Sequence, residues 1–436
     1  MISAPNHQQP LNGNKFLAYL LLPLLLISCG AFKKSQKTEW PEDDELVVVN
    51  PSTDEPDKAI SDIKDSKEKN EVKLVYSTVF FKGEPYKVPV HQKSFEIAVL
   101  LPFHSDMNNS SSDIRRSDFM LEYYQGMKLA VKEAEKLGSK FNIHFYDTDN
   151  DTTTLINILK KAELDKMDII IGPTDYAQVK IAAYFARKRE IPLFSPITSM
   201  TSVWSNNPYV FNLNPSDQMQ AKEFLTYFKK HHKDENLFIV RDGEYFDKNF
   251  GMALIAECKA QKVTITSISY DRFLKWSDYL GDSNAVIVHT SYNKTSVNFS
   301  VTSLLSMAPN VTLVGPDKWL DFSSVDYSQW EKLNITFIGK NKAQLHNDKS
   351  REMVSQYRLL YNDDPSWYTY MGYDHLLFSC EVLNAFGEYF PLFIEGKDLA
   401  YTNTNIKLNK EGNCFQNQYI TILQLRDSKL IDVTQL

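Results

Sequence analysis

The sequence predicts an α/β protein with two lobes, each built around a mostly parallel sheet. From Phe95 onward, short continuous apolar runs alternate with segments whose apolar residues recur at helical spacing. Such runs are typical of strands covered on both faces, and strand–helix alternation implies parallel strands joined by right-handed crossovers. The alternation stops near "YVFNLNPSDQMQ" and then begins again. Roughly 340 residues follow Phe95, which is more than one core usually holds, so two lobes are expected.

In the first half of this region, strands and helices are expected in alternation. The apolar runs predict strands at 95–103, 141–150, 167–173 and 191–196. The helical patterns predict helices at 118–138, 152–166 and 176–190, the first closed by Gly138 and the second capped by Thr or Asp. The loops at the carboxyl ends of these strands should face one edge of the sheet.

The second half repeats the pattern after a predicted helix at 217–231. Strands are expected at 237–240, 263–270, 284–290 and 311–316. Between them we expect helices near 247–260 and 295–307 and a short helix around Trp276. This is a second sheet of similar size.

Composition excludes several functions. The net charge is −7, with acidic and basic residues mixed, whereas nucleic-acid binding calls for a clustered basic face. No phosphate-binding glycine loop, nucleophile elbow or His-Glu-x-x-His helix is present, so we expect no enzyme activity, no cofactor and no metal. Cys258, Cys380 and Cys414 are too few for a disulfide framework in a chain this long. They are expected to be buried thiols, with a Cys380–Cys414 pair as the alternative.

The start of the chain predicts export and attachment to a membrane. The apolar run from Phe16 to Ile27 would rise only about 18 Å as a helix, too short for a bilayer core of roughly 30 Å. It is typical of a secretory signal peptide, and "LISC" (26–29) resembles the bacterial lipobox, which places a lipid on Cys29. The alternative is an ordinary signal peptide with an incidental cysteine. The aromatic, Asn- and Lys-rich composition is similar to that of proteins from Bacteroidetes-type bacteria.

Between this anchor and the first lobe, two kinds of segment are expected. Residues 31–70 are rich in charge, proline and serine, so they cannot bury enough surface to offset chain entropy and should form a disordered tether. Residues 71–90 alternate like two strands around a turn at Gly83 and Pro85, which predicts a small hairpin against the main body.

An ordered series of motifs resembles the type I periplasmic binding protein fold, and within it the branched-chain amino acid receptors. The series comprises "IAVLLPF", "YYQGMKLAVKEA", "FYDTDND", "IIIGPTD", "IPLFSPITS", "YVFNLNPSDQMQA" and "PSWYTYMGYDHLLFSCEVL", and the resemblance covers about Phe95 to Leu436. It implies two Rossmann-like lobes joined by a three-strand hinge, with crossings near Leu213–Asn214, near Ile338–Lys342 and beyond Pro391. A ligand would lie between the lobes at the strands' carboxyl ends.

These boundaries define the expected domains. Residues 1–28 form the signal peptide and residues 29–94 form the lipid-anchored linker with its hairpin. Lobe one comprises 95–213 plus 342–395, and lobe two comprises 214–341 plus 396–436.

The resemblance also implies ligand-binding residues in lobe one. In the amino-acid-binding relatives, a serine-rich turn after the third strand and a Ser-Pro-x-Ala-Thr turn after the fourth hold the ligand carboxylate. Here "GPTDYAQ" (172–178) lacks those serines, and its aspartate disfavours a carboxylate, whereas "SPITSM" (195–200) keeps the hydroxyls. Turn formation and helix capping explain the same residue types. The candidate residues are Thr174, Asp175, Tyr176, Ser195, Thr198 and Ser199.

In lobe two, the resemblance places Phe250 where relatives use a tyrosine ring against the ligand. It places Asp317 near the acidic residue that binds the ligand ammonium group. Ser291 and Tyr292 follow a buried strand and should face the cleft, and Trp319 is a further wall residue. The alternatives are a core aromatic for Phe250 and a solvated turn residue for Asp317.

Two functions follow. The first is a lipid-anchored extracytoplasmic protein that captures a small solute, such as an amino acid, peptide or cell-wall fragment, for a permease or as a sensor. The second is an interaction lipoprotein that uses the same fold to regulate a cell-envelope enzyme such as a peptidoglycan synthase. Either would be periplasmic, and Gly30 rather than Asp after the cysteine favours the outer over the inner membrane.

Overall fold

The computed structural model describes residues 75–103, 111–198, 206–281, 284–307, 310–323, 325–340 and 348–434, with side chains of the first helix described from Asp118. The expected signal peptide, the lipid site Cys29 and the tether lie outside these residues. Residues 72–436 form one compact unit that contains two seven-stranded sheets.

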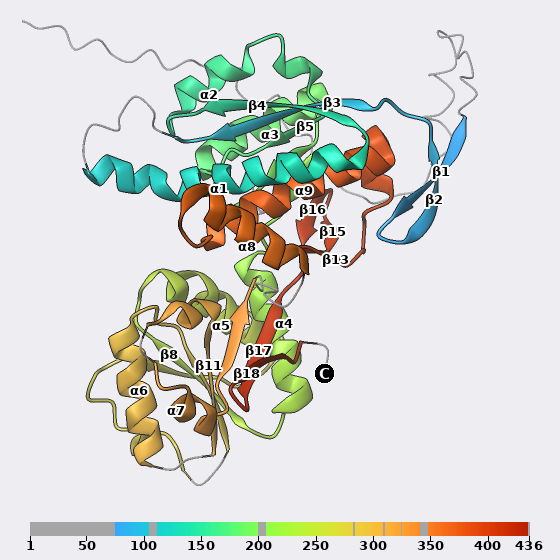
Figure 1. The fold of residues 1–436 in the computed structure, drawn as a ribbon. Coiled ribbons are helices and arrows are strands. Elements are labelled where there is room, and N and C mark those ends of the chain that lie inside the picture. The colour runs from blue at the N-terminus through green and yellow to red at the C-terminus, as the bar shows by residue number, and fades with distance from the viewer. Residues whose placement is uncertain are drawn as a thin grey trace, which may run out of the picture. The chain divides into compact units, whose positions relative to one another are not determined.

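The first sheet has the strand order β15-β16-β7-β6-β5-β3-β4, and all neighbours except β15 and β16 run parallel. Its strands are β3 (Ser94–Leu101), β4 (Lys140–Asp147), β5 (Ile169–Ile171), β6 (Leu193–Ser195), β7 (Val210–Asn212), β15 (Leu408–Glu411) and β16 (Cys414–Asn417). One face packs against α1 (Ser111–Ala134), α8 (Asp348–Tyr361) and α9 (Trp367–Phe386). The other face packs against α2 (Thr152–Leu159) and α3 (Tyr176–Arg189), as Figure 1 shows.

The second sheet has the order β18-β17-β12-β11-β10-β8-β9, with β17 and β18 antiparallel to their neighbours. Its strands are β8 (Asn236–Arg241), β9 (Thr266–Ser269), β10 (Ala285–His289), β11 (Val311–Pro316), β12 (Thr336–Gly339), β17 (Thr421–Arg426) and β18 (Lys429–Asp432). One face is covered by α4 (Asp217–His231) and α5 (Met252–Ala260), and the other by α6 (Lys294–Ser306) and α7 (Tyr327–Lys332).

Short elements connect these parts. The single-turn helices are η1 (Glu135–Leu137), η2 (Leu164–Lys166), the π-helical η3 (Asp247–Gly251), η4 (Trp276–Asp278), η5 (Asp317–Asp321) and η6 (Gly387–Leu392). Two small hairpins pair β1 (Tyr76–Phe81) with β2 (Glu84–Pro89) and β13 (Leu399–Ala400) with β14 (Asn405–Ile406). Phe81 of the first hairpin packs against Phe386 of α9, with ring centroids 5.0 Å apart, so the predicted hairpin against lobe one is confirmed.

The two-lobed α/β architecture with mostly parallel sheets is therefore confirmed, but one boundary is wrong. Residues 408–417 were expected in lobe two, whereas β15 and β16 extend the first sheet and only β17 and β18 join the second. The reason is packing, because Phe415 stacks on Phe211 of β7 with ring centroids 4.5 Å apart. The third crossing therefore lies between Asn417 and Thr421.

A buried amide network holds two of the crossings together. Gln416 accepts a hydrogen bond from Asn212 Nδ2 (3.0 Å) and donates to the Asn214 carbonyl (3.0 Å). Asn417 donates to the carbonyls of Leu213 (2.9 Å) and Asn405 (3.0 Å). The side chains of Asn212, Gln416 and Asn417 are fully buried, so these bonds replace solvent for most of their polar atoms, whereas Asn212 Oδ1 has no partner among the described residues.

The closest helix contact in lobe one is the crossing of α1 and α9, which depends on two glycines. A Cβ on Gly126 would collide with the backbone carbonyl of Thr369, and one on Gly372 would collide with that of Tyr123. Buried Tyr123 also bonds His375 Nδ1 across this contact at 2.9 Å. Only glycine allows the backbones to approach so closely.

We predict that Gly126→Ala lowers the free energy of unfolding by about 2–3 kcal/mol, because the methyl group forces the two helices apart. Urea unfolding followed by circular dichroism measures this. Gly281→Ala is the matched control, because a Cβ there meets no atom within 4 Å. Equal stability of the two variants would show that the crossing is not tightly packed.

Candidate functional site

The polar loops at the carboxyl ends of the parallel strands form the candidate site. In lobe one these loops follow β4, β5 and β6, and in lobe two they follow β8, β10, β11 and β12. Ligands of open α/β sheets bind at this edge because helix N-termini and strand-end loops converge there.

In lobe one, Asp175 is the N-cap of α3. Its Oδ1 accepts hydrogen bonds from the backbone N–H groups of Ala177 (2.9 Å) and Gln178 (3.3 Å). Thr174 and Tyr176 are half-buried beside it, and the ring of Tyr176 packs against the core beneath α3. The backbone donors that could bind an anion at this helix start are thus filled by the protein's own carboxylate.

The loop after β6 is joined to the loop after β5. Thr198 Oγ1 donates to the Thr174 carbonyl at 2.7 Å, so these two predicted residues do come together. Ser195 is fully buried at the end of β6, and, as for Thr148 and Thr404, its hydroxyl has no hydrogen-bond partner among the described residues. Ser199 lies outside the described residues.

In lobe two, Asp317 follows β11 and its carboxylate lies over Gly339 at the end of β12, where a Cβ would collide with it. Burial, and secondarily the charge of Asp321, raise the pKa of Asp317 to about 7, although Lys340 and Lys318 act in the opposite direction. Both lysines are engaged elsewhere, because Lys340 pairs with Asp217 at 2.9 Å and Lys318 with Asp321 at 2.7 Å. Among the described residues, no ion pair to Asp317 is found, although the charges of these two lysines act on it.

Two tyrosines lie near these carboxylates. The side chain of Tyr292 is 40 % exposed, and burial followed by the charges of Asp317 and Asp217 raises its pKa. Tyr245 is 72 % exposed, and partial burial, followed by the charges of Asp217 and Tyr368, raises its pKa.

Three predicted wall residues belong to the core instead. Phe250 is wholly buried between Phe246 and Phe224, because η3 turns its ring under α4, so its predicted contact with a ligand is wrong. Ser291 is also wholly buried: its Oγ accepts from the Asn293 N–H at 3.0 Å and its carbonyl accepts from Trp319 Nε1 at 2.7 Å. Trp319 packs in the core against Trp330.

Sequence reasoning missed Tyr245, Asp217 and Lys340. Asp217 was taken as part of a helix start and Lys340 as part of a crossing, and no motif marks them as site residues. One signal was present for Asp217, because it begins the helix predicted at 217–231, whereas Tyr245 lies in a predicted loop and no strand was predicted before Lys340.

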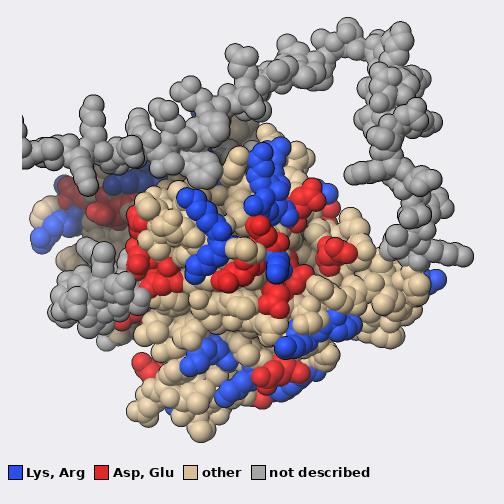
Figure 2. Space-filling view, turned by 90° about the horizontal axis from the view of Figure 1, so that it is seen from above, with Lys and Arg blue, Asp and Glu red and all other residues tan. Residues whose placement is uncertain are grey.

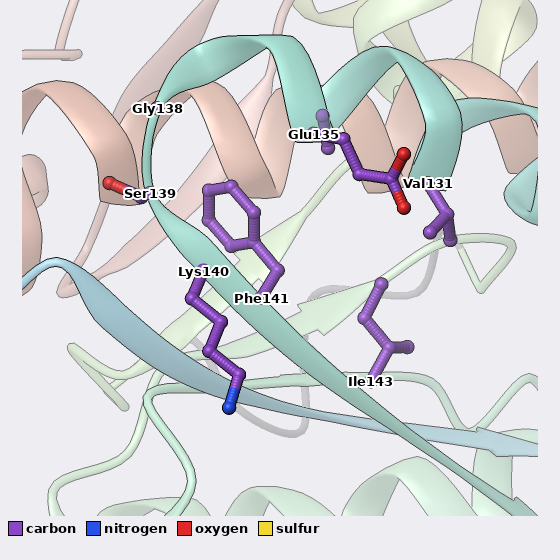
Figure 3. A pocket seen from close by; sticks show the side chains of 8 residues that line it. Val131, Glu135, Gly138, Ser139, Lys140, Phe141 and Ile143 are labelled. Atoms are coloured by element: carbon purple, nitrogen blue, oxygen red, sulfur yellow. The ribbon is translucent and has the colours of Figure 1, made fainter.

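Other features do not define a site at this edge. A cavity of about 470 Å³ lies between the end of α1 and the start of β4, lined by Val131, Phe141 and Ile143 (Figure 3), at the opposite end of the strand. Basic and acidic side chains are interspersed on the face shown in Figure 2. Within the described ranges, no group of three or more His, Cys, Asp or Glu is placed to hold a metal ion, and no helix has the length and apolarity to cross a membrane.

Cys258, Cys380 and Cys414 are free and buried, so the alternative Cys380–Cys414 pair is wrong.

Comparison with known proteins supports the fold. Residues 106–273 match the model of a family described as periplasmic binding protein. No curated protein sequence matches the chain. A substrate-binding protein of an ABC transporter from Desulfitobacterium hafniense, solved with Leu, is 15 % identical with a TM-score of 0.51, covering 78 % of this chain and 100 % of its own.

Two further solved structures agree. A periplasmic ligand-binding protein of a branched-chain amino acid ABC transporter from Burkholderia xenovorans is 12 % identical, with a TM-score of 0.53 over 78 % of this chain and 94 % of its own. An ABC transporter solute-binding protein from Rhodopseudomonas palustris, solved with 3,4-dihydroxybenzoic acid, is 14 % identical, with a TM-score of 0.51 over 78 % and 96 %. The chain therefore has the type I periplasmic binding protein fold.

We predict that Asp317→Asn stabilises the protein at neutral pH. The pKa of Asp317 is raised in the folded state, so the folded state holds a proton that the unfolded state releases as the pH rises from about 4 to 7. Ionisation of Asp317 therefore lowers the free energy of unfolding of the wild type by up to about 4 kcal/mol across this pH window. The amide of the Asp317→Asn variant does not ionise, so the variant avoids this decrease.

Urea unfolding of both proteins at pH 4 and pH 8 measures the difference. Asp326→Asn is the control, because Asp326 is an exposed N-cap of α7 that accepts from the Ser328 N–H. If wild type and Asp317→Asn keep the same difference in stability at both pH values, Asp317 is not strained by burial.

Proposed function

We propose that this protein is an extracytoplasmic solute-binding protein of the kind that delivers a small ligand to an ABC permease. The observation that carries the proposal is a fold with two mostly parallel sheets, each with polar loops at the carboxyl ends of its strands, that is shared with ligand-bound structures. The lobes would close over a ligand and remove it from water, which strengthens each polar contact. The ligand-bound relatives hold Leu and 3,4-dihydroxybenzoic acid, so small molecules of that size are the expected class.

The candidate ligand contacts come from both lobes. Lobe one contributes Thr174, Tyr176, Thr198 and the buried hydroxyl of Ser195, with Ser199 as a further candidate outside the described residues. Lobe two contributes Asp317 and the ring of Tyr292. The domain boundaries we propose are 95–213, 348–386 and 408–417 for lobe one, and 217–340 and 421–432 for lobe two.

The proposal also includes a lipid anchor at Cys29 and the segment that joins it to the folded part. A lipid on Cys29 would hold the protein at a membrane while the residues before Val75 allow the folded part to reach a partner. Gly30 favours the outer membrane.

We expect a thermal melt to detect the ligand. Amino acids, short peptides, muropeptides, aromatic acids and amines are added singly, and a compound at about 100 times its Kd should raise the Tm by several degrees. A panel without any shift, together with recovery of a cell-wall enzyme rather than a permease in a pull-down, would favour the regulatory lipoprotein instead.

The anchor has its own test. Cys29→Ala should move the protein from the membrane fraction to the soluble fraction and abolish incorporation of labelled palmitate, because no thiol remains for acylation. A high-salt wash of wild-type membranes is the control, since it releases proteins held only by charge. Retention of the alanine variant on the membrane after that wash would contradict lipid anchoring.

A further inference from the structure

Strand β4 is the last strand of the first sheet, and its inner side pairs with β3. The N–H of Lys140 donates to the Lys93 carbonyl on that inner side at 2.8 Å. In a parallel pair every second residue directs both its N–H and its C=O toward the neighbouring strand. The backbone groups of Phe141, Ile143 and Phe145 are therefore directed to the outer edge, where no strand pairs with β4 among the described residues.

The sequence of β4, "KFNIHFYD", does not protect this outer edge. Unpaired edge strands are commonly guarded by a proline, a bulge or an outward-pointing lysine. Between its charged ends β4 contains no proline or lysine, and His144 Nε2 lies 2.7 Å from Glu96 Oε2 of its own sheet. Phe141, Ile143 and Phe145 are only half-buried. The edge is therefore apolar and suited to pairing with another strand.

A cavity of about 470 Å³ borders the start of β4. Figure 3 shows the side chains of Phe141 and Ile143 on the same side of β4 as those of Val131 and Glu135, which approach from the helix. A strand added to the outer edge would present side chains to this same face, about 5 Å from those of β4. The cavity provides space for such side chains beside α1.

Charges at the two ends of β4 indicate what kind of strand pairs with it. Glu135 lines the cavity beside Phe141, near the start of the strand. Toward its end, Lys128 lies 5.6 Å from the ring centroid of Tyr124, and Tyr124 packs on Phe145 with ring centroids 4.8 Å apart. No ion pair within the described ranges includes Lys128 or Glu135. The α1 side of this edge thus has a negative end, an apolar middle and a positive end.

The opposite face of β4 also has unlike ends. Lys140 is exposed at the start of the strand, and Tyr146 near its end donates to Glu163 at 2.7 Å. Lys161 lies 5.0 Å from the centroid of the same tyrosine ring and reduces the negative charge there. The pair on the α1 side therefore carries the charge argument.

We propose that the outer edge of β4 is an interface between two copies of this chain, which pair antiparallel about a two-fold axis at Ile143 and join their first sheets. This register places Phe141 opposite Phe145 of the partner subunit, and the outward backbone groups of the two strands meet as hydrogen-bonded pairs. It also brings Glu135 toward Lys128 of the partner subunit. A second copy fits because its own edge, once reversed, supplies the opposite charge at each end.

Light scattering coupled to size-exclusion chromatography tests the proposal on the full chain purified from membranes in detergent. A strand pair is small for a specific interface, so the protein is studied from about 1 to 100 µM. The mass of the protein part should rise from one chain toward two as the concentration increases. A mass of one chain throughout this range overturns the proposal.

One variant tests the backbone pairing. Ile143→Pro removes an N–H that is directed away from β3, and proline is tolerated on edge strands at such positions. Because the two-fold axis doubles the loss, this change should weaken dimer formation about tenfold or more. Circular dichroism confirms that the variant is folded.

Charge exchange tests the register without altering the strand. Glu135→Lys places two lysines together in each half of the interface and should weaken the dimer about fivefold or more. The double variant Glu135→Lys with Lys128→Glu restores unlike charges and should recover wild-type dimer formation. Lys259→Glu, a charge reversal at an exposed position of α5, is the control and should change nothing.

The variants distinguish this interface from any other. A dimer that withstands both Ile143→Pro and Glu135→Lys uses a different surface and overturns the assignment to β4. Failure of the double exchange to recover the dimer overturns the antiparallel register. If the proline variant does not fold, the charge exchange remains decisive, because Glu135 is exposed and Lys128 lies on the helix surface. None of these outcomes depends on which solute the protein binds.

Discussion

Two buried amide side chains fix the point at which the chain passes between its sheets. Gln416 and Asn417 bond the backbone of Leu213, Asn214 and Asn405, so strand β16 and the exit from β7 are held as one unit. These groups are shielded from water, and breaking one of their bonds would leave unpaired dipoles in the interior. Any rotation of the lobes must therefore occur outside this network. The strand-end loops of the candidate site are positioned relative to that fixed point.

The candidate site contains buried polar groups that are incompletely compensated, as do some other parts of the described structure. Within the described ranges, Asp317 is held partly out of water without an ion pair, and the hydroxyl of Ser195 is buried without a hydrogen-bond partner. Elsewhere buried charge is well satisfied: Asp374 in α9 accepts four hydrogen bonds from residues 402–404, and Asp247 pairs with Arg241 at 2.8 Å. The contrast marks Asp317 as a buried carboxylate whose charge the described residues compensate less fully than that of Asp374 or Asp247.

The sequence predicted the order of strands and helices well, because each buried strand and amphipathic helix carries its own periodic signal. Helix α4 (Asp217–His231) and strand β11 (Val311–Pro316) begin and end where the pattern predicts. The assignment of 408–417 failed because pairing of β16 with β7 joins residues about 200 positions apart. No local pattern records which sheet an apolar strand will join.

The same limit applies to side-chain direction in the site. A position after a strand identifies the ligand edge, but it does not say whether a side chain points outward. Asp317 and Thr198 lie at that edge, whereas Phe250 and Ser291, chosen by the same reasoning, point into the core. The difference depends on neighbours distant in sequence: Gly339 leaves room for Asp317, and α4 supplies Phe224 to cover Phe250.

Helix caps explain how one fold can serve different ligands. The backbone N–H groups at the start of α3 are fixed by the fold, but the group that occupies them is chosen by a single side chain. A short hydroxyl there adds no negative charge to the site, whereas the Asp175 carboxylate occupies the donors and repels a second anion. Exchanging a hydroxyl for a carboxylate at this cap requires no movement of the sheet or the helix. The residue that caps α3 therefore sets the charge at this edge of the sheet without altering the fold.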